Sequence, residues 1–442
     1  MKVCGIIAEY NPFHSGHAWQ IARARAESGS DYVIVVMSGD FVQRGAPALI
    51  DKYTRARMAL CDGADLVLML PVYGSTASAE GFARAGIAAL LTTGVVHAVS
   101  FGCEDVSVCA DNYRHLARQL SHETPDFQAA LSAGLTAGIP YAQARVDAVR
   151  LCVCKNSDLS LLDTPNNLLA FEYMRALEYF QAALQLVPIK RLGSYHDTAC
   201  QASEPWSPAG ISGAAAVTGK NPDDGSGALF ASASACRKLL LSDSATQLQT
   251  LADSHIIPTE ACKLLADYAA GYDFLQEDDL SAALHYALLV QKDNGYETFA
   301  DCGRDLSARI CGHLDAFSQF SGFCDLLKNK SMTRARIARA LTHILLQLPG
   351  QMPAPLTSGD GTLPYLRVLG FRRTAAPLMH QIRRCARVPL ITRVPEAEQT
   401  LPAEALLYFK QDLFASDIYR SVLLQKCGRC YPDDYRRKIE II

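Results

Sequence analysis

The 442-residue sequence has no apolar run that approaches the ~20 residues needed for a membrane-spanning helix. It also lacks an excess of charge, because 42 basic and 45 acidic residues leave a formal net charge of -3. Binding to a nucleic acid would therefore depend on a local basic patch rather than on the overall charge. We expect no membrane association, and the length suits two or three globular domains.

A disulfide framework is missing as well. The 15 cysteines are odd in number and scattered, and several, such as Cys4 and Cys61, lie in apolar runs. The only close pairs lie at 152–154 and 427–430, and a lone C-x-x-C is weak support for zinc. The apolar start of the chain does not resemble a signal peptide. These features are typical of reduced thiols in a cytoplasmic protein.

The sharpest local signal is a polar motif between a predicted strand and a predicted helix. Val3–Ala8 is short and apolar, as in a buried parallel strand, and Ala18–Arg25 is rich in helix-forming residues. The segment Glu9–His17 between them reads EYNPFHSGH, and Pro12 prevents one continuous helix across it. The junction of a strand end with a helix start is where α/β sheets bind nucleotides.

Two imidazoles, His14 and His17, stand at this junction. The amino end of a helix favours anions, and two histidines can add donors that stabilise charge developing during transfer at phosphorus. The same spacing also suits two surface histidines in a turn, or two ligands of zinc. Zinc needs three or four ligands, and no third one stands nearby at a recognisable spacing. We therefore predict a phosphate site with catalytic His14 and His17 and no bound metal.

A second apolar strand ends in a carboxylate. Tyr32–Met37 is followed by Ser-Gly-Asp40, which puts Asp40 at the same edge of the sheet as the histidines. Asp40 could simply cap or orient a loop, or it could orient a substrate amine and take its proton. Arg44 in the next loop could face a phosphate. We include Asp40 among the predicted catalytic residues, with the loop role left open.

Strand and helix patterns continue to alternate up to about residue 245. The expected strands are Val3–Ala8, Tyr32–Met37, Leu66–Leu70, Val95–Phe101 and Leu186–Arg191, with helices near 18–25, 51–60, 75–91, 111–150 and 166–184. Some of the cations of the 51–60 helix, which include Lys52 and Arg55, are expected to be solvated. The alternation predicts an α/β fold with a Rossmann-like parallel sheet over residues 1–245.

Several residues at the predicted strand ends suit a nucleotide. Gly102 would let an adenine or ribose lie against bare backbone, and the amides of Asn166 and Asn167 begin a helix. Lys190 and Arg191 end the fifth strand with two cations. Each of these features also has a structural explanation. Gly102 could belong to a plain turn, the two asparagines could cap a helix, and the two cations could be solvated.

Residues 202–230 break the alternation with Ser, Pro, Gly and Asp, so we predict a flexible loop or lid over the site. The segment 232–238 then opens a helix with hydroxyls and cations. These groups could form a second phosphate cradle or an ordinary helix start.

From about residue 246 long helical patterns predict a mostly α-helical second domain over 246–442. Residues 328–343 contain no acid, and their cations are Lys328, Lys330, Arg334, Arg336 and Arg339. Arg336 and Arg339 share one face of the expected helix. Such a face is often merely solvated, but the absence of acids favours the phosphate backbone of an RNA. A second basic run consists of Arg367, Arg372, Arg373, Arg383, Arg384 and Arg387.

Motifs along the whole chain resemble those of a known family. They are Glu9–His17, Met37–Gly45, Ala64–Leu68, Phe101–Glu104, the segment that begins at Asn166 and Asn167, and Ile189–Arg191. The first is similar to the HxGH signature of the nucleotidyltransferase superfamily, and the full set resembles the bacterial tRNA(Met) cytidine acetate ligase family. The sequence departs from the family at Ser15, where asparagine is usual, and at Ala46 and Met69, where acidic residues are expected.

The resemblance implies a cytoplasmic ligase without a membrane or protein partner. It would use ATP with Mg²⁺ and acetate to form acetyl-adenylate, and then acetylate the exocyclic amine of the wobble cytidine of elongator tRNA(Met). The residues implied to contact ATP are Ile7, Ala8, Glu9, Tyr10, Asn11, Pro12, Phe13, His14, Ser15, Gly16, His17, Gln20, Gly102, Asn166 and Arg191.

Two alternatives remain at this point. One is a small-molecule adenylyl- or cytidylyltransferase, which the basic helical region disfavours. The other is a non-catalytic nucleotide- and RNA-binding protein, which the intact pair of histidines disfavours.

Overall fold

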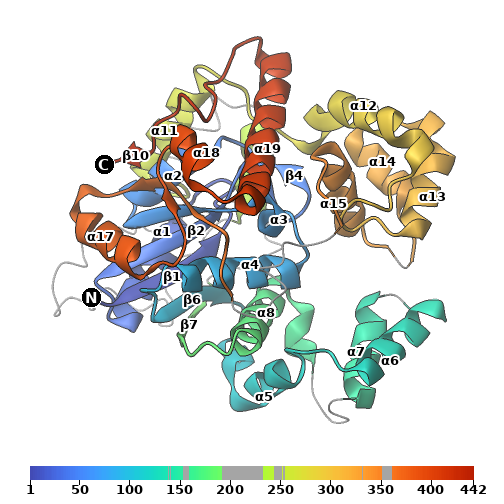
Figure 1. The fold of residues 1–442 in the computed structure, drawn as a ribbon, viewed down its shortest axis with the longest axis horizontal. Helices are drawn as coiled ribbons and strands as arrows, with labels where there is room; N and C mark the ends of the chain where they lie inside the picture. The colour runs from blue at the N-terminus through green and yellow to red at the C-terminus, as the bar shows by residue number, and fades with distance from the viewer. Residues whose placement is uncertain are drawn as a thin grey trace.

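The computed structural model describes residues 1–137, 139, 141–152, 159–191, 232–242, 251, 254–330, 332–350 and 361–442. The loop predicted at 202–230 lies outside these residues. Figure 1 shows a central sheet with helices on both faces and a group of helices, α12 to α15, beside it.

The sheet has eight strands in the order β10-β8-β5-β2-β1-β6-β7, with β9 paired to β8. Its strands are β1 (Val3–Ala8), β2 (Tyr32–Ser38), β5 (Leu66–Leu70), β6 (Ala98–Cys103), β7 (Gln185–Lys190), β8 (Leu366–Phe371), β9 (Leu390–Ile391) and β10 (Glu440–Ile441). The five strands predicted from the sequence are adjacent and parallel. A separate hairpin joins β3 (Phe41–Val42) to β4 (Ala46–Pro47).

Side chains of the strands alternate between two apolar cores. In β1, Cys4 and Ile6 face one core and Val3 and Ile7 face the other. The first core is covered by α1 (Ser15–Ser28), α2 (Lys52–Cys61), α11 (Thr259–Ala269) and α19 (Ala403–Cys427). The second is covered by α4 (Ala79–Thr92), α5 (Asp111–Gln119), α8 (Pro165–Tyr179) and α17 (Ala376–Cys385). Because both faces are buried, the strands read as continuous apolar runs.

The remaining helices flank these layers. They are α3 (Val72–Ser75), α6 (Pro125–Thr136), α7 (Tyr141–Cys152), α9 (Ala233–Ser242), α12 (Ser281–Gln291), α13 (Arg304–His313), α14 (Phe320–Leu327), α15 (Arg334–Leu345) and α18 (Val394–Thr400). Helices of the described residues do not combine the length and apolar character that crossing a bilayer requires.

The C-terminal region is mostly helical, as predicted, but it also returns to the sheet. β8 pairs antiparallel with β5, and β9 and β10 pair with β8. These three strands were not predicted, because β9 and β10 have two residues each and β8 follows a long helical stretch. One apolar core contains residues from both sides of position 245, so the two predicted parts pack as one body. The boundary at 245 stays a prediction.

Candidate active site

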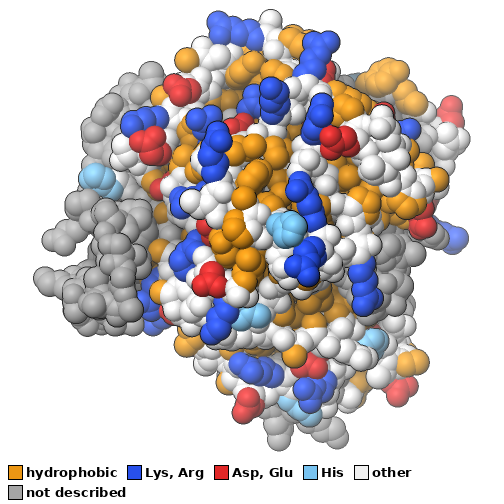
Figure 2. All heavy atoms as spheres, turned by 60° about the vertical axis from the view of Figure 1, so that its left-hand side comes forward, with side chains coloured by type: hydrophobic (Ala, Val, Ile, Leu, Met, Phe, Trp, Pro, Cys, Tyr) orange, Lys and Arg blue, Asp and Glu red, His pale blue; other side chains and the backbone are white. Residues whose placement is uncertain are grey.

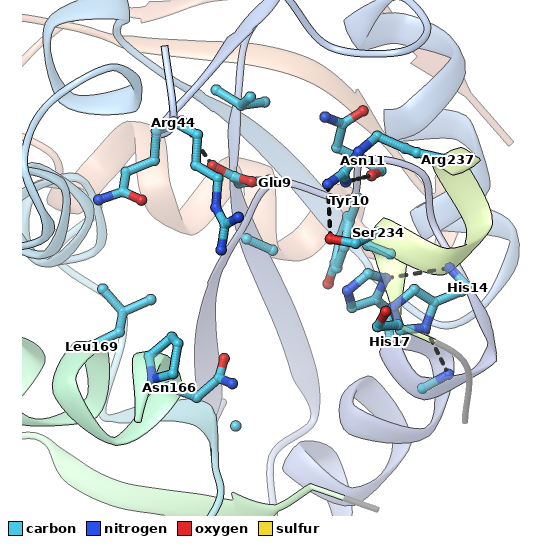
Figure 3. A pocket seen from close by; sticks show the side chains of 18 of the residues that line it. Glu9, Tyr10, Asn11, His14, His17, Arg44, Asn166, Leu169, Ser234 and Arg237 are labelled. Atoms are coloured by element: carbon cyan, nitrogen blue, oxygen red, sulfur yellow. Dashed lines mark hydrogen bonds between the residues drawn. The ribbon is translucent and has the colours of Figure 1, made fainter. Parts of the chain in front are cut away.

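A cavity of about 590 Å³ lies at the carboxyl ends of β1, β6 and β7 (Figure 3). That volume is in the range of small-ligand sites. Its wall is built from the end of β1 and the start of α1, the β3–β4 hairpin, the starts of α8 and α9, and residues 275–277 with Arg334 from the C-terminal region. Segments from both halves of the chain therefore form one site.

His14 and His17 are fixed by backbone N–H groups at the start of α1. The Gly16 N–H donates to Nδ1 of His14 at 3.2 Å, and the His14 N–H donates to Nδ1 of His17 at 3.3 Å. The two rings are stacked, with centroids 3.7 Å apart. Because each Nδ1 is an acceptor, a neutral ring carries its proton on Nε2. Each imidazole therefore has one remaining donor, its Nε2–H.

Both histidines are neutral in this state. Burial, followed by the charges of Arg191 and Arg237, lowers the pKa of His14 to about 3. Burial, His14 and Arg191 lower the pKa of His17 well below its ordinary value. A bound polyphosphate would oppose these shifts, because its negative charge favours protonated imidazole. The cluster is thus arranged to receive an anion.

Two arginines supply fixed positive charge beside the histidines. Arg191 donates from Nη1 to Oδ1 of Asn166 at 3.1 Å. Arg237 of α9 donates to the main-chain oxygen of Asn11 and, at 3.0 Å, to Oγ of Ser234. Burial lowers the pKa of both arginines, but guanidinium remains charged in proteins. Neither side chain forms an ion pair with a described carboxylate.

Asn166 and Asn167 have different roles. Glu104 accepts from the side chain of Asn166 and from the N–H of Asn167 at 2.9 Å, which anchors the start of α8 beneath the cavity. Oδ1 of Asn167 in turn accepts from the N–H of Glu104 at 2.9 Å. Asn167 is buried, whereas Asn166 lines the cavity next to Arg191.

A buried arginine holds the strand ends in place. Arg55 is fully buried and donates to main-chain oxygens of Glu9 at 2.7 Å, Ser38 at 3.1 Å and Ile50 at 3.1 Å. The expectation that some cations of this helix are solvated holds for Arg57, which is 51% exposed, but not for Arg55 or Lys52. In this interior position the guanidinium group of Arg55 donates hydrogen bonds to carbonyl groups that the turns after β1 and β2 would otherwise leave without partners.

Gly45 lets the β3–β4 hairpin pack directly against the C-terminal region at the cavity wall. Gly45 has φ +71, and a Cβ atom there would lie 2.5 Å from the backbone of α15. Its carbonyl accepts from Oγ1 of Thr342 at 2.9 Å. The absent side chain lets the β3–β4 hairpin lie directly on α15, so the hairpin and that helix share the cavity wall.

Comparisons with known proteins identify the family of the chain. The family model described as HIGH Nucleotidyl Transferase matches residues 1–221 and 218–431. A tRNA(Met) cytidine acetate ligase of Clostridium kluyveri is 32% identical over 406 residues, covering 90% of each chain. That of Caldanaerobacter subterraneus subsp. tengcongensis is 30% identical over 420 residues and 95% of each chain. The chain belongs to the tRNA(Met) cytidine acetate ligase family.

A solved structure extends the similarity to the whole fold. The crystal structure of Thermotoga maritima TmcAL bound with alpha-thio ATP superposes with a TM-score of 0.82 at 26% identity. The match covers 100% of this chain and 99% of that one. The family resemblance inferred from the motifs is confirmed, together with the sheet and the helical C-terminal region.

Twelve of the residues predicted to contact ATP line the cavity: Ile7, Ala8, Glu9, Tyr10, Asn11, His14, Gly16, His17, Gln20, Gly102, Asn166 and Arg191. Pro12, Phe13 and Ser15 are not among the lining residues. Phe13 is fully buried, 4.9 Å from the Tyr10 ring, and Ser15 donates to the carbonyl of His255 at 2.6 Å. These three residues shape the turn behind the cavity, and their contact with ATP stays a prediction.

Asp40 does not line the cavity. Its carboxylate accepts from Nζ of Lys52 at 2.7 Å, and the two side chains are 4% and 3% exposed. The same ammonium lies 3.0 Å from Asp434, which pairs with Arg367 at 2.8 Å. The catalytic prediction for Asp40 is therefore replaced by the structural alternative, because a carboxylate held in this way has no access to a substrate.

The five cations predicted to bind RNA divide into two sets. Arg334 pairs with Glu277 and, at 3.3 Å, with Asp325, and Arg339 pairs with Asp301 at 2.7 Å. These acids come from segments that the local sequence could not reveal. Arg336 is half-buried, and Lys328 and Lys330 are exposed. Their binding to RNA remains a prediction, and Arg334 also lines the cavity.

Some cavity residues were not singled out although they lie in recognised segments, such as Gln43, Leu169 and Tyr173. Others, Leu275, Gln276 and Glu277, came from a segment with no recognised motif. The stretch that contains Gln276 and Glu277 reads as a turn before a helix, so nothing local connects it with a nucleotide site. Among the described residues, no group of three or more His, Cys, Asp or Glu side chains is placed to hold a metal ion.

Proposed function

We propose that this protein uses ATP to activate acetate as acetyl-adenylate and then acetylates the exocyclic amine of the wobble cytidine of elongator tRNA(Met). The observation that carries the proposal is the stacked pair His14 and His17, held with Arg191 and Arg237 at one end of the cavity. The substrate in the relatives' name and the alpha-thio ATP in the related structure support the same activity.

In the first step an acetate oxygen attacks the α-phosphorus of ATP. A bond forms between that oxygen and the phosphorus, the bond to the β-phosphate oxygen breaks, and pyrophosphate leaves with the electron pair. The Nε2–H groups of His14 and His17 and the two guanidinium groups are suited to stabilise the charge on the phosphoryl oxygens. ATP would enter with Mg²⁺ held by its phosphates, since Mg²⁺ keeps several waters and needs few protein ligands.

Tyr10 is the best candidate to orient acetate. Its ring lies 4.8 Å from that of His17, and its hydroxyl is buried without a hydrogen-bond partner among the described residues. Burial raises the pKa of Tyr10, so the hydroxyl stays protonated and can donate. An unpaired buried donor is costly unless a ligand satisfies it, and a carboxylate is a strong acceptor.

In the second step the cytidine amine attacks the acetyl carbonyl carbon. The new N–C bond replaces the bond between the acetyl group and AMP, and the amine loses a proton. The tRNA would reach the cavity beside Arg334, with Lys328, Lys330, Arg336 and Arg339 as candidate phosphate contacts of the C-terminal region. The proposal places the enzyme in the cytoplasm, where its tRNA substrate is found.

The direct test is to incubate the protein with ATP, radiolabelled acetate and bulk tRNA, and to follow the label. We expect the label in acid-insoluble RNA, from which it is recovered as acetylcytidine. Pyrophosphate release that depends on a phosphate ester instead of acetate would indicate a small-molecule nucleotidyltransferase. No pyrophosphate release with either substrate would indicate a non-catalytic binding protein, and both outcomes would overturn the proposal.

A further inference from the structure

A row of cations covers the outer face of α17, far along the chain from the predicted RNA-binding stretch. His380, Arg383, Arg384 and Arg387 follow the spacing i, i+3, i+4 and i+7, which places them on one side of the helix and its end. Arg373 precedes the same helix, and all five side chains are exposed. The opposite side of α17 packs Leu378, Met379 and Ile382 into the second core.

These cations have no neutralising partners. Neither a hydrogen bond nor an ion pair joins the side chains of Arg373, Arg383, Arg384 or Arg387 to any described residue. The other members of this basic run are already occupied. Arg367 is paired with Asp434, and Arg372 donates to the carbonyl of Leu60 at 2.7 Å.

The surrounding surface keeps this charge uncompensated. The sequence contains no acidic residue between Asp360 and Glu396. Figure 2 brings this side of the molecule forward, and Lys and Arg side chains are spread over it with fewer acidic ones between them. By contrast, Arg334 and Arg339 of α15 are each paired with carboxylates. Among the described residues, four cations at α17 therefore have no carboxylate partner, whereas the stretch singled out by the sequence keeps three, Lys328, Lys330 and Arg336.

Helix stability does not explain the whole row. Cations in the last turn, such as Arg383 and Arg384, interact favourably with the helix dipole. Arg373 stands at the amino end of the same helix, where the dipole disfavours a cation. A ligand with repeated negative charge would account for both ends of the row.

The face lacks the features of a membrane-binding helix. Such helices bury an apolar side in the lipid interface, whereas the apolar side of α17 is already occupied by the protein core. No large exposed hydrophobic residue is found among the described residues 372–388. A flexible chain of phosphates fits exposed arginines better, because each guanidinium can contact one phosphate group.

We propose that the α17 face, defined by Arg373, Arg383, Arg384 and Arg387, binds the phosphate backbone of the tRNA substrate. This inference rests on the proposed function for the identity of the RNA. The face lies at the amino edge of the sheet, because β8 runs antiparallel to β5 and ends beside the start of that strand. The catalytic cavity lies at the opposite edge.

The two edges are separated by the length of a strand. A six-residue strand such as β1 spans roughly 20 Å at about 3.3 Å per residue. One face of an elongated, folded RNA can therefore contact α17 while a base from another part enters the cavity. The α17 contacts position the RNA and take no part in the chemistry.

The test compares two full-length variants that lose the same charge. In the first, Arg383→Gln, Arg384→Gln and Arg387→Gln remove three cations of the α17 face. In the control, Arg118→Gln, Lys263→Gln and Arg393→Gln remove three exposed cations that are paired with Glu178, Glu260 and Glu396. Binding of bulk tRNA is measured over a range of salt, and acetate-dependent pyrophosphate release is measured without RNA.

The α17 variant should bind tRNA more weakly, and its slope of log affinity against log salt should fall by about two, since each phosphate contact contributes roughly 0.7–0.9. The control should keep the wild-type slope, and both should release pyrophosphate normally. A wild-type slope in the α17 variant, or an equal fall in the control, would overturn the proposal. So would loss of binding to vesicles of equal parts phosphatidylserine and phosphatidylcholine with unchanged tRNA binding.

The outcomes separate this inference from the proposed function. Acetylation of tRNA by the wild type, together with an unchanged slope in the α17 variant, would reject only the α17 face. Binding of tRNA that depends on α17, without acetate-dependent chemistry, would reject only the proposed activity. Absence of tRNA binding by the wild type would reject both.

Discussion

Two polar clusters lie at the same edge of the sheet, one half-buried and one buried, and they are built in opposite ways. The histidine cluster, His14, His17, Arg191 and Arg237, follows β1 and β7 and has no carboxylate in ion-pair contact among the described residues. The ion-pair network, Asp40, Lys52, Asp434 and Arg367, lies at the end of β2 and the start of β8, and each of its cations has a carboxylate within hydrogen-bond distance. Only the first cluster lines the cavity.

The pKa values show what this difference means. Burial alone would lower the pKa of Lys52, but Asp40 and Asp434 outweigh it and raise the value. Burial alone would raise the pKa of Asp434, but Arg367 and Lys52 lower it. In the histidine cluster no such compensation exists, and the imidazoles lose their protons. A network that is complete holds the fold, whereas a cluster that lacks its anion is ready to bind one.

The largest effect is expected from breaking the ion-pair network. Lys52→Met should lower the free energy of unfolding by about 3–5 kcal/mol, because it leaves Asp40 and Asp434 buried beside too little positive charge. Lys263→Met is the matched control, since Lys263 is 63% exposed and pairs with the exposed Glu260, and it should leave the free energy of unfolding nearly unchanged. Denaturant unfolding measures both, and equal losses would contradict the contrast.

Breaking the histidine cluster should impair catalysis more than stability. His14→Ala and His17→Ala should each lower acetate-dependent pyrophosphate release by about 10²–10³-fold, the usual effect of losing one donor to a reacting oxyanion. Because Nδ1 of His14 caps α1, His14→Ala should also cost about 1 kcal/mol of stability.

His14→Asn separates the two roles, since asparagine is a good helix cap. It should restore the stability but not the activity. Near-normal turnover in His14→Ala and His17→Ala would contradict the catalytic assignment.

The third effect concerns pH. The folded pKa values of His14 and His17 lie below the unfolded value, so the unfolded chain binds more protons as the pH falls. Stability is therefore full above about pH 6.5 and should fall by about 2 kcal/mol between pH 6.5 and 5.5 for two such histidines. The pKa of the Asp434 carboxyl group is also lowered, but from a lower ordinary value, so this group affects stability only below about pH 4. Unfolding measured at both pH values should show a smaller change in a His14→Asn, His17→Asn double variant, and an equal change would refute this account.

The smallest effect is expected at the edge of the histidine cluster. Tyr10→Phe removes one hydroxyl without changing the packed ring, so it should raise the KM for acetate about tenfold, the equivalent of one good hydrogen bond. The KM for ATP should change little. Tyr173→Phe is the matched control, since Tyr173 also lines the cavity and is buried. Equal changes in the KM for acetate and ATP would place Tyr10 at the nucleotide instead.

Local patterns in the sequence were sufficient for the strand–turn–helix motif and the five parallel strands. An apolar run identifies a strand that is buried on both faces, and Pro12 and Gly16 mark the turn that follows β1. Twelve predicted nucleotide contacts lie together in the cavity because most belong to that one continuous segment. The assignment of Asp40 was less secure, because its position at a strand end allowed two roles.

The sequence by itself determined the first layer of the site, its two histidines and the family. The tertiary structure decided which charges are paired. Lys52 and Asp434 are 382 residues apart in the chain, and Arg237 reaches the carbonyl of Asn11 across 226 residues. Periodicity and turn chemistry act over a few residues, whereas such pairs depend on how distant segments pack. For that reason Asp40 belongs to a structural ion-pair network, and Arg334 and Arg339 of α15 are paired with carboxylates. The arginines at the end of α17 have no such partners among the described residues.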